Sequence, residues 1–249
     1  MSHSHFFIAG AQRSGTTVLA ETLSMHPEIA MAQPLYPEPK YFLPEKRAHY
    51  SLEEYLAIFF EYRCEKKVLG EKSVSYFETS GVAELIHQHL PDARFIFILR
   101  DPVSRAISNF NFSVRHGFEK RTLMEVFETM EDRAADEKEL GLSASPFAYL
   151  ARGLYAGCLA PFERVFGRDS IFILIQELWV AEDFPLAPLL TFLNVDTSAQ
   201  VDLREGLSWK SAADAVPEDL RLRLAGYYQS ANDALRKRYQ TDLSLWTKA

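Results

Sequence analysis

Short apolar runs alternate with amphipathic segments along most of this chain. Apolar runs, which are typical of strands buried on both faces, occur at residues 6–10, 29–32, 94–99 and 171–175, and residues 68–72 (VLGEK) form a further predicted strand. Apolar residues at helical spacing predict helices at residues 16–25, 51–62, 81–90, 102–115, 123–140, 145–166, 185–193 and 217–239. Pro161 should kink or break the helix that contains it. The alternation predicts one α/β domain over residues 1–249, with a mainly parallel central sheet and helices on both faces.

The first apolar run leads into a glycine-bracketed loop. Gly10 ends the run, Gly15 follows five residues later, and a helical pattern begins at Thr16. Glycines allow backbone N–H groups to turn around an anion, and the start of a helix directs its positive dipole end at the same place. The spacing matches G-x-x-x-x-G-K-[ST], except that Thr16 stands where the lysine of nucleotide hydrolases would be. The loop, with Arg13 as its cation, is therefore expected to hold a phosphate-like group but to suit magnesium–ATP poorly.

Ionisable residues follow four of the predicted strands. Arg13, Glu38, Lys72 and Arg100 come at or just after the ends of the first four predicted strands. Ligands of open α/β sheets bind at the edge formed by the carboxyl ends of the strands. Taken one at a time, these residues are equally compatible with surface salt bridges or a solvated carboxylate. Together, three cations and one carboxylate at this edge predict a site for an anion and a reacting hydroxyl group.

The composition and net charge of the chain limit the kinds of partner that the protein is expected to bind. The 249 residues are 47% hydrophobic, which supports a sizeable core, and the net charge of −7 argues against nucleic acid. Cys64 and Cys158 have no metal-like spacing and fit a reducing compartment. We find no signal-peptide pattern, no apolar run long enough to span a membrane and no His/Asp cluster for a metal, so a cytoplasmic protein without a metal is expected.

Two motifs in this order resemble sulfotransferases that use 3′-phosphoadenosine-5′-phosphosulfate (PAPS). Residues 7–17 (FIAGAQRSGTT), followed by a His-Pro pair, are similar to the loop that binds the 5′-phosphosulfate. Residues 95–108 (FIFILRDPVSRAIS) are similar to the 3′-phosphate motif. Residues 38–42 (EPKYF), 71–77 (EKSVSYF) and 152–156 (RGLYA) resemble elements of the heparan-sulfate and carbohydrate branch. The resemblance covers nearly the whole chain and implies a P-loop nucleotide-hydrolase-like sulfotransferase fold.

The resemblance also implies a role for each motif residue. Glu38 is the general base that takes a proton from an acceptor hydroxyl, and Arg13 and Lys72 are the other catalytic residues. The donor, whose product is adenosine 3′,5′-bisphosphate, is held by Gln12, Arg13, Ser14, Gly15, Thr16 and Thr17 at its 5′ end and by Arg100 and Ser108 at its 3′-phosphate. No metal is needed, because in-line sulfuryl transfer requires mainly positioning and charge neutralisation. A carbohydrate is the favoured acceptor, while a lipid, peptide, steroid or small metabolite stays open.

The chain departs from the family pattern at three places. Arg13 stands where many glycan sulfotransferases have lysine, and Val74 replaces a common proline. Near the C-terminus there is no Lys-Gly pair for the 3′-phosphate, so Lys210 is the substitute candidate. Residues 203–215, which include Trp209, are predicted to form a lid that orders when the nucleotide binds.

Two other functions remain open from the residues. One is a P-loop nucleotide kinase or hydrolase, which would depend on magnesium. The other is a non-catalytic nucleotide-binding module, which would bind the nucleotide without turnover. Should Glu38 not be the base, His116 is the next candidate.

Overall fold

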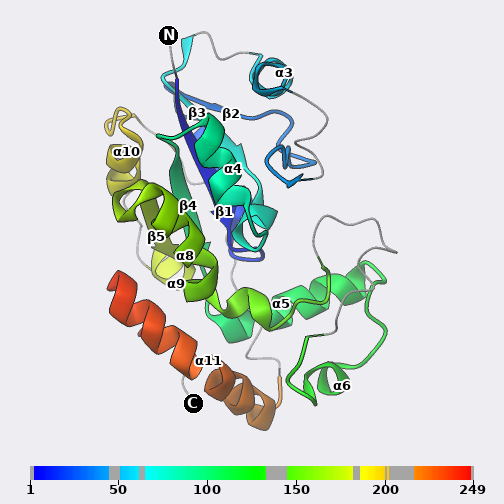
Figure 1. Cartoon of the computed structure of the whole chain (residues 1–249). Coiled ribbons are helices and arrows are strands. Elements are labelled where there is room, and N and C mark those ends of the chain that lie inside the picture. The colour runs from blue at the N-terminus through cyan, green and yellow to red at the C-terminus, as the bar shows by residue number, and fades with distance from the viewer. Residues whose placement is uncertain are drawn as a thin grey trace.

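Five parallel strands form the centre of the molecule. The computed structural model describes residues 3–44, 51–61, 65–132, 145–181, 186–199, 201 and 216–247. The strand order is β2-β3-β1-β4-β5, and the first strand therefore lies in the middle of the sheet (Figure 1). The strands are β1 (Ser4–Gly10), β2 (Ile29–Met31), β3 (Val68–Lys72), β4 (Arg94–Leu99) and β5 (Ile171–Ile175). All five lie where the sequence predicted them.

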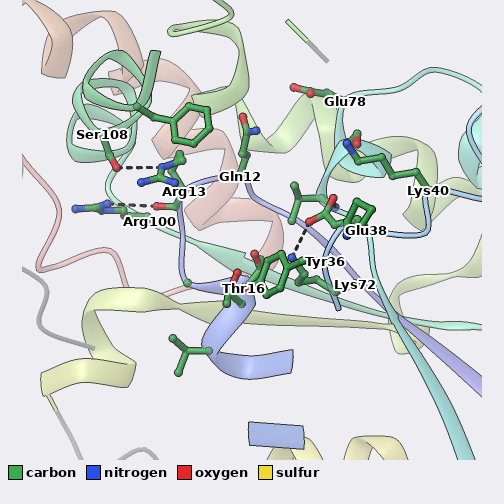
Figure 2. Close-up of a pocket in the computed structure, with 17 residues that line it drawn as sticks. Gln12, Arg13, Thr16, Tyr36, Glu38, Lys40, Lys72, Glu78, Arg100 and Ser108 are labelled. Atoms are coloured by element: carbon green, nitrogen blue, oxygen red, sulfur yellow. Dashed lines mark hydrogen bonds and ion pairs between the residues drawn. The ribbon is translucent and has the colours of Figure 1, made fainter. Parts of the chain in front are cut away.

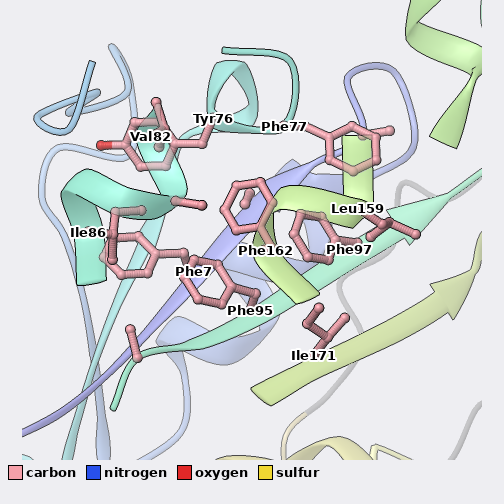
Figure 3. Close-up of a cluster of buried hydrophobic side chains, with 14 of the residues drawn as sticks. Phe7, Tyr76, Phe77, Val82, Ile86, Phe95, Phe97, Leu159, Phe162 and Ile171 are labelled. Atoms are coloured by element: carbon pink, nitrogen blue, oxygen red, sulfur yellow. The ribbon is translucent and has the colours of Figure 1, made fainter. Parts of the chain in front are cut away.

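Alternating strand residues supply two separate apolar cores. Phe7 and Phe95 stack on each other on one face, at 5.6 Å between ring centroids, under α4 (Val82–His89) and α8 (Tyr155–Phe166) (Figure 3). Phe6 and Ile96 point to the opposite face, against α1 (Thr16–Ser24) and α10 (Ala187–Leu193). Because both faces are covered, most strand positions on either face are apolar, and Glu71 and Lys72 at the end of β3 are exceptions. The predicted α/β sheet with helices on both faces is confirmed.

A third apolar cluster lies beyond the carboxyl ends of the strands. It joins α5 (Pro102–Arg115), α6 (Leu123–Phe127) and α11 (Glu218–Tyr239), which lie together below the sheet in Figure 1. The start of α5 is defined by its sequence, since Asp101 accepts a hydrogen bond from the Ser104 amide and Pro102 occupies the first turn. This cluster fixes α5 next to the strand ends, where the cavity described below is found.

Several helix boundaries differ from the sequence prediction. Helix α8 begins at Tyr155 and not at residue 145, because the Pro146 carbonyl accepts hydrogen bonds from the buried Asn109 and Ser113 side chains. It then runs through Pro161 as one helix, so the expected break is wrong; the packing of its buried side chains, Tyr155, Leu159 and Phe162, against the sheet outweighs the proline. Helix α6 ends at Phe127, well short of residue 140, and residues 133–140 lie outside the described residues.

The remaining elements are short. Helix α3 (Leu52–Phe59) follows a complete capping box at Ser51 and Glu54, as predicted. Helix α9 (Gln176–Ala181) was not predicted, since it follows β5 without a turn signal. Three 3₁₀ turns complete the described structure: η2 (Val74–Phe77), η3 (Ala151–Gly153) and η4 (Arg168–Ser170).

Candidate active site

A cavity of about 550 Å³ opens at the carboxyl ends of β1, β3 and β4. Figure 2 shows the side chains around it, with the arginines at one end and a glutamate–lysine pair at the other. Its lining includes most of the residues that the sequence predicted for the site: Gln12, Arg13, Gly15, Thr16, Thr17, Glu38, Lys72, Arg100 and Ser108. The fold therefore brings together motifs that are up to 96 positions apart in the sequence, from Gln12 to Ser108.

The loop between β1 and α1 is shaped to receive an anion. Gly15 has a left-handed backbone, φ 92°, and it is the N-cap of α1 without any side-chain hydrogen bond to the first turn. The amides at the start of α1 are thus left for a ligand. Ser14 is fully buried in the loop, and its hydroxyl has no hydrogen-bond partner among the described residues. An oxyanion bound here would satisfy these donors, so the residues fit a phosphate or sulfate group.

Two arginines lie close together beside this loop. Arg13 Nε donates to Ser108 Oγ over 3.4 Å, and the Arg13 guanidinium lies 4.9 Å from the centre of the Phe112 ring. Arg100 donates from Nη1 to the Arg13 carbonyl oxygen at 3.2 Å. Burial lowers the pKa of Arg13, and the nearby charge of Arg100 lowers it further. Burial also lowers the pKa of Arg100. A bound anion would relieve this repulsion, which makes this end of the cavity suited to a phosphate.

A buried ion pair occupies the opposite end of the cavity. Lys72 Nζ donates to Glu38 Oε1 at 2.8 Å, and the two side chains are 4% and 12% exposed. The amide of Val74 donates to the other carboxylate oxygen of Glu38 at 3.2 Å. Lys72 Nζ also lies 4.6 Å from the centre of the Tyr36 ring. Glu38 is thus held as an oriented hydrogen-bond acceptor in a poorly hydrated place, as a general base requires.

A match to a protein-family model shows the family of this chain. Residues 3–143, more than half of the chain, match the family model described as "Sulfotransferase domain". The chain belongs to the sulfotransferase family. The resemblance found in the motifs is therefore confirmed, although the family match alone assigns no role to any residue.

Named relatives and a solved structure agree with this assignment. Mouse heparan sulfate glucosamine 3-O-sulfotransferase 3A1 is 29% identical over 70% of this chain and 41% of its own length. Mouse carbohydrate sulfotransferase 15 is 28% identical over 88% of this chain and 48% of its own length. A crystal structure of a sulfotransferase from Alicyclobacillus acidocaldarius has a TM-score of 0.79 and 26% identity, and each chain covers 99% of the other. This sulfotransferase chain spans less than half the length of these curated relatives.

In this sulfotransferase, hydrogen bonds of Arg152 join the loop between β1 and α1 to α5 and η3. The sequence did not predict this network. Arg152 Nη1 donates to Gln12 Oε1 and, at 3.2 Å, to Asn109 Oδ1. Its Nε donates to Glu78 Oε2, and its Nη2 donates to Glu78 Oε1 at 2.7 Å. Arg152 lies in a segment that resembled the family, but nothing in its spacing indicated a contact with Gln12. Glu78, Lys40 and Tyr36 line the cavity as well, without having been predicted.

A second network of hydrogen bonds holds the backbone at Arg100 and Asp101. Tyr155 donates its hydroxyl to the Arg100 carbonyl oxygen at 2.7 Å. Glu177, at the start of α9, accepts hydrogen bonds from the Asp101 amide at 2.8 Å and from Trp246 Nε1 at 2.9 Å. Burial raises the pKa of Glu177, and these hydrogen bonds act in the opposite direction. The C-terminal segment is therefore attached directly to the strand end that carries Arg100.

The remaining candidates lie elsewhere. His116 is exposed, its Nδ1 donates to the Phe112 carbonyl oxygen at 2.8 Å, and it is not among the residues that line the cavity. Lys210 and the predicted lid at residues 203–215 lie outside the described residues. In the part of the chain that the structure describes, no three His, Cys, Asp or Glu side chains form a group that could hold a metal ion. Over the same part, no helix is both long and apolar enough to cross a membrane.

Proposed function

We propose that this protein transfers the sulfuryl group of PAPS to a hydroxyl group of a carbohydrate acceptor. The observation that carries the proposal is the arrangement of the cavity: an anion-binding loop and two arginines lie at one end, and a buried carboxylate–lysine pair lies at the other. Membership of the sulfotransferase family supports the reaction class. The donor, the base and the acceptor are our assignments.

The residues present fit the donor. The amides at the start of α1, with Thr16 and Thr17, would hold the 5′-phosphosulfate, while Arg100 and Ser108 would hold the 3′-phosphate. When bound, PAPS supplies a sulfuryl group joined to a phosphate leaving group. Arg13, which lies in the same loop and beside Ser108, would neutralise charge that develops on the leaving phosphate.

The proton of the acceptor hydroxyl would pass to Glu38. Its two hydrogen bonds, from Lys72 and from the Val74 amide, orient the carboxylate before any acceptor arrives. Base catalysis of this kind contributes about 10²–10⁴ in rate. Lys72 would keep the charge at this end balanced as the proton moves, and the surrounding buried side chains would limit competition from water.

A carbohydrate acceptor is supported by the relatives and by one feature of the cavity. The names of the two mouse relatives refer to heparan sulfate glucosamine and to carbohydrate. Tyr36, next to the Glu38 loop, is 53% exposed at the cavity and offers a flat ring against which an acceptor ring can pack.

The test is transfer of labelled sulfate from PAPS to a panel of hydroxyl acceptors in the presence of a metal chelator. The panel compares glucosamine-containing and uronic-acid-containing glycans with lipid, peptide and steroid alcohols. We expect the labelled sulfate to be incorporated into an oligosaccharide. Turnover of ATP that requires magnesium would favour the kinase or hydrolase instead. Tight binding of adenosine 3′,5′-bisphosphate without transfer to any acceptor would favour a non-catalytic module.

A further inference from the structure

A second glutamate lies directly beside the lysine of the cavity. Glu71 and Lys72 are neighbours on β3, and successive side chains of a strand point to opposite faces. Lys72 reaches Glu38 in the cavity, whereas Glu71 points into the protein, where it is 1% exposed. Among the ion pairs of the described residues, none involves Glu71. A buried carboxyl group of this kind needs hydrogen-bond donors, and their identity indicates its role.

The donors to Glu71 are hydroxyl groups. Tyr55 donates to Oε2 at 2.5 Å, and Ser73 donates to Oε1 at 2.5 Å. The Tyr76 side chain lies close to Glu71 as well. Burial raises the pKa of Glu71, and the hydroxyl groups of Ser73, Tyr55 and Tyr76 oppose that rise. Two hydroxyl groups thus donate to one buried carboxyl group, and a third lies near it.

The same hydroxyl groups hold the loop that carries Glu38. Ser73 Oγ accepts a hydrogen bond from the Lys40 amide at 3.0 Å, and the Tyr76 hydroxyl accepts one from the Phe42 amide at 2.9 Å. The Tyr55 ring stacks on the ring of Tyr41, with centroids 4.4 Å apart and an interplanar angle of 19°. Three consecutive loop residues, 40–42, are therefore each in contact with a side chain that donates to Glu71 or lies beside it.

The direction of these hydrogen bonds depends on Glu71. A hydroxyl group has one hydrogen to donate and two lone pairs to accept with. Because Glu71 takes the hydrogen of Ser73, the lone pairs of the Ser73 oxygen are left to accept from the Lys40 amide. Linked hydrogen bonds of this kind also strengthen one another in a buried site.

We propose that Glu71 is a positioning residue for the transfer reaction: it fixes the hydroxyl groups of Tyr55, Ser73 and Tyr76, which hold residues 40–42 and so keep Glu38 against Lys72. Lys72 and Glu71 then hold Glu38 in two different ways from opposite faces of β3. Lys72 contacts the Glu38 carboxylate, whereas Glu71 acts through the backbone of the loop that carries Glu38. The catalytic consequence rests on the proposed function, whereas the effect on the loop does not.

The first measurement is the rate of amide hydrogen exchange at Lys40 and Phe42, monitored by NMR in the full chain. We expect Glu71→Gln to accelerate exchange at both amides by about tenfold or more, because an amide side chain has one acceptor oxygen in place of the two to which Tyr55 and Ser73 donate. Exchange in α4, at residues 82–89, should stay unchanged. Glu163→Gln is the matched control, since Glu163 accepts from the Tyr239 hydroxyl at 2.6 Å on another face of the molecule. It should leave both loop amides as they are.

The second measurement is kinetic. Misplacing a reacting group by about 1 Å costs on the order of 10²-fold in rate, so Glu71→Gln should lower kcat by roughly ten- to a hundredfold. The dissociation constant of adenosine 3′,5′-bisphosphate should change by less than about twofold, because the loop of residues 40–42 holds the base and not the donor. The double variant Glu71→Gln/Ser73→Ala should be no slower than Glu71→Gln alone, since both act through one network.

Single hydroxyl deletions keep the test decisive if Glu71→Gln does not fold. Ser73→Ala should accelerate exchange at Lys40 alone, and Tyr76→Phe at Phe42 alone. Unchanged exchange at these amides would overturn the proposal, and so would faster exchange with wild-type kcat. A wild-type protein that transfers no sulfate would refute the proposed function, and the exchange data would then still decide whether Glu71 fixes the loop.

Discussion

The ionisable side chains around the cavity differ in their hydrogen-bond partners. Glu38 has two donors, Lys72 and the Val74 amide, which fix both of its oxygens. Arg13 and Arg100 instead contact a hydroxyl group and a carbonyl oxygen among the described residues. The carboxylate end is thus organised by the protein itself, whereas the proposed donor would bring an anion to the arginine end. Two predictions follow at the level of single residues.

Glu38→Gln should remove most of the turnover and leave nucleotide binding intact. The amide keeps the size of the side chain but cannot accept a proton, so kcat should fall by about 10²–10⁴. Affinity for adenosine 3′,5′-bisphosphate, measured by titration calorimetry, should stay within about twofold. Glu84→Gln, at an exposed ion pair with Arg164, is the control and should be fully active. A near wild-type rate for Glu38→Gln would place the base elsewhere.

Arg100→Ala should weaken the bisphosphate far more than adenosine 5′-monophosphate. A charge-assisted hydrogen bond contributes about 1.5–3 kcal/mol, so the loss for the bisphosphate should be roughly ten- to a hundredfold. Arg164→Ala, whose side chain is 68% exposed, should change neither affinity. If the wild-type protein binds both nucleotides equally well in calorimetry, Arg100 has no 3′-phosphate to hold.

Among the secondary-structure elements, the short turn after β3 has the most direct effect on the site. Val74 is the first residue of η2, and its amide donates to Glu38. Ser73, which precedes it, has an extended backbone with φ −146° and ψ 90°, a conformation that a following proline tolerates. The residue at position 74 therefore decides whether Glu38 receives a second hydrogen bond, without changing the turn itself.

Val74→Pro should keep the fold and lower kcat. Proline suits the first position of a helical turn but has no N–H, so Glu38 would lose one of its two donors. We expect kcat to fall by about tenfold, consistent with one hydrogen bond to a charged group, and circular dichroism to be unchanged. Val74→Ala retains the amide and should stay close to wild type. Equal rates for the proline and alanine variants would show that the Val74 amide does not contribute.

On the scale of the whole molecule, the end of the described chain closes the network behind the cavity. Trp246 is 4% exposed and bonds to Glu177, which in turn holds the Asp101 amide. Thr247 donates its hydroxyl to Asp101 Oδ2 at 2.9 Å. Residues separated by about 145 positions thus share one buried polar network, and the strand end that carries Arg100 depends on the C-terminal segment.

Trp246→Phe should destabilise the protein more than Trp179→Phe. Both indoles are almost fully buried, but Trp246 Nε1 donates to Glu177, whereas Trp179 Nε1 has no hydrogen-bond partner among the described residues. The loss of volume is the same, so the difference reports the hydrogen bond and should be about 1–3 kcal/mol in the free energy of unfolding from urea titrations. Bisphosphate affinity should fall in the Trp246 variant alone. Equal losses of stability would contradict a structural role for this contact.

The apolar pattern and the two specific motifs determined much of this protein in advance. All five strands, the parallel sheet, the family and most of the cavity lining follow from local sequence, because buried parallel strands and anion-binding loops require particular residues at fixed spacing. The start of α5 at Pro102 is equally local, since Asp101 and the proline define it without help from other segments. The roles of the site residues and the cytoplasmic location remain predictions.

Tertiary contacts decided the rest, since they join residues whose pairing has no sequence signal. The late start of α8 depends on the Asn109 and Ser113 side chains, which bind the Pro146 carbonyl. The contact of Arg152 with Gln12, the direction of the Arg13 side chain and the burial of Glu71 under the Glu38 loop depend on which elements pack together. Spacing along the chain places a side chain at a strand end, but only the packing of distant segments determines its partner.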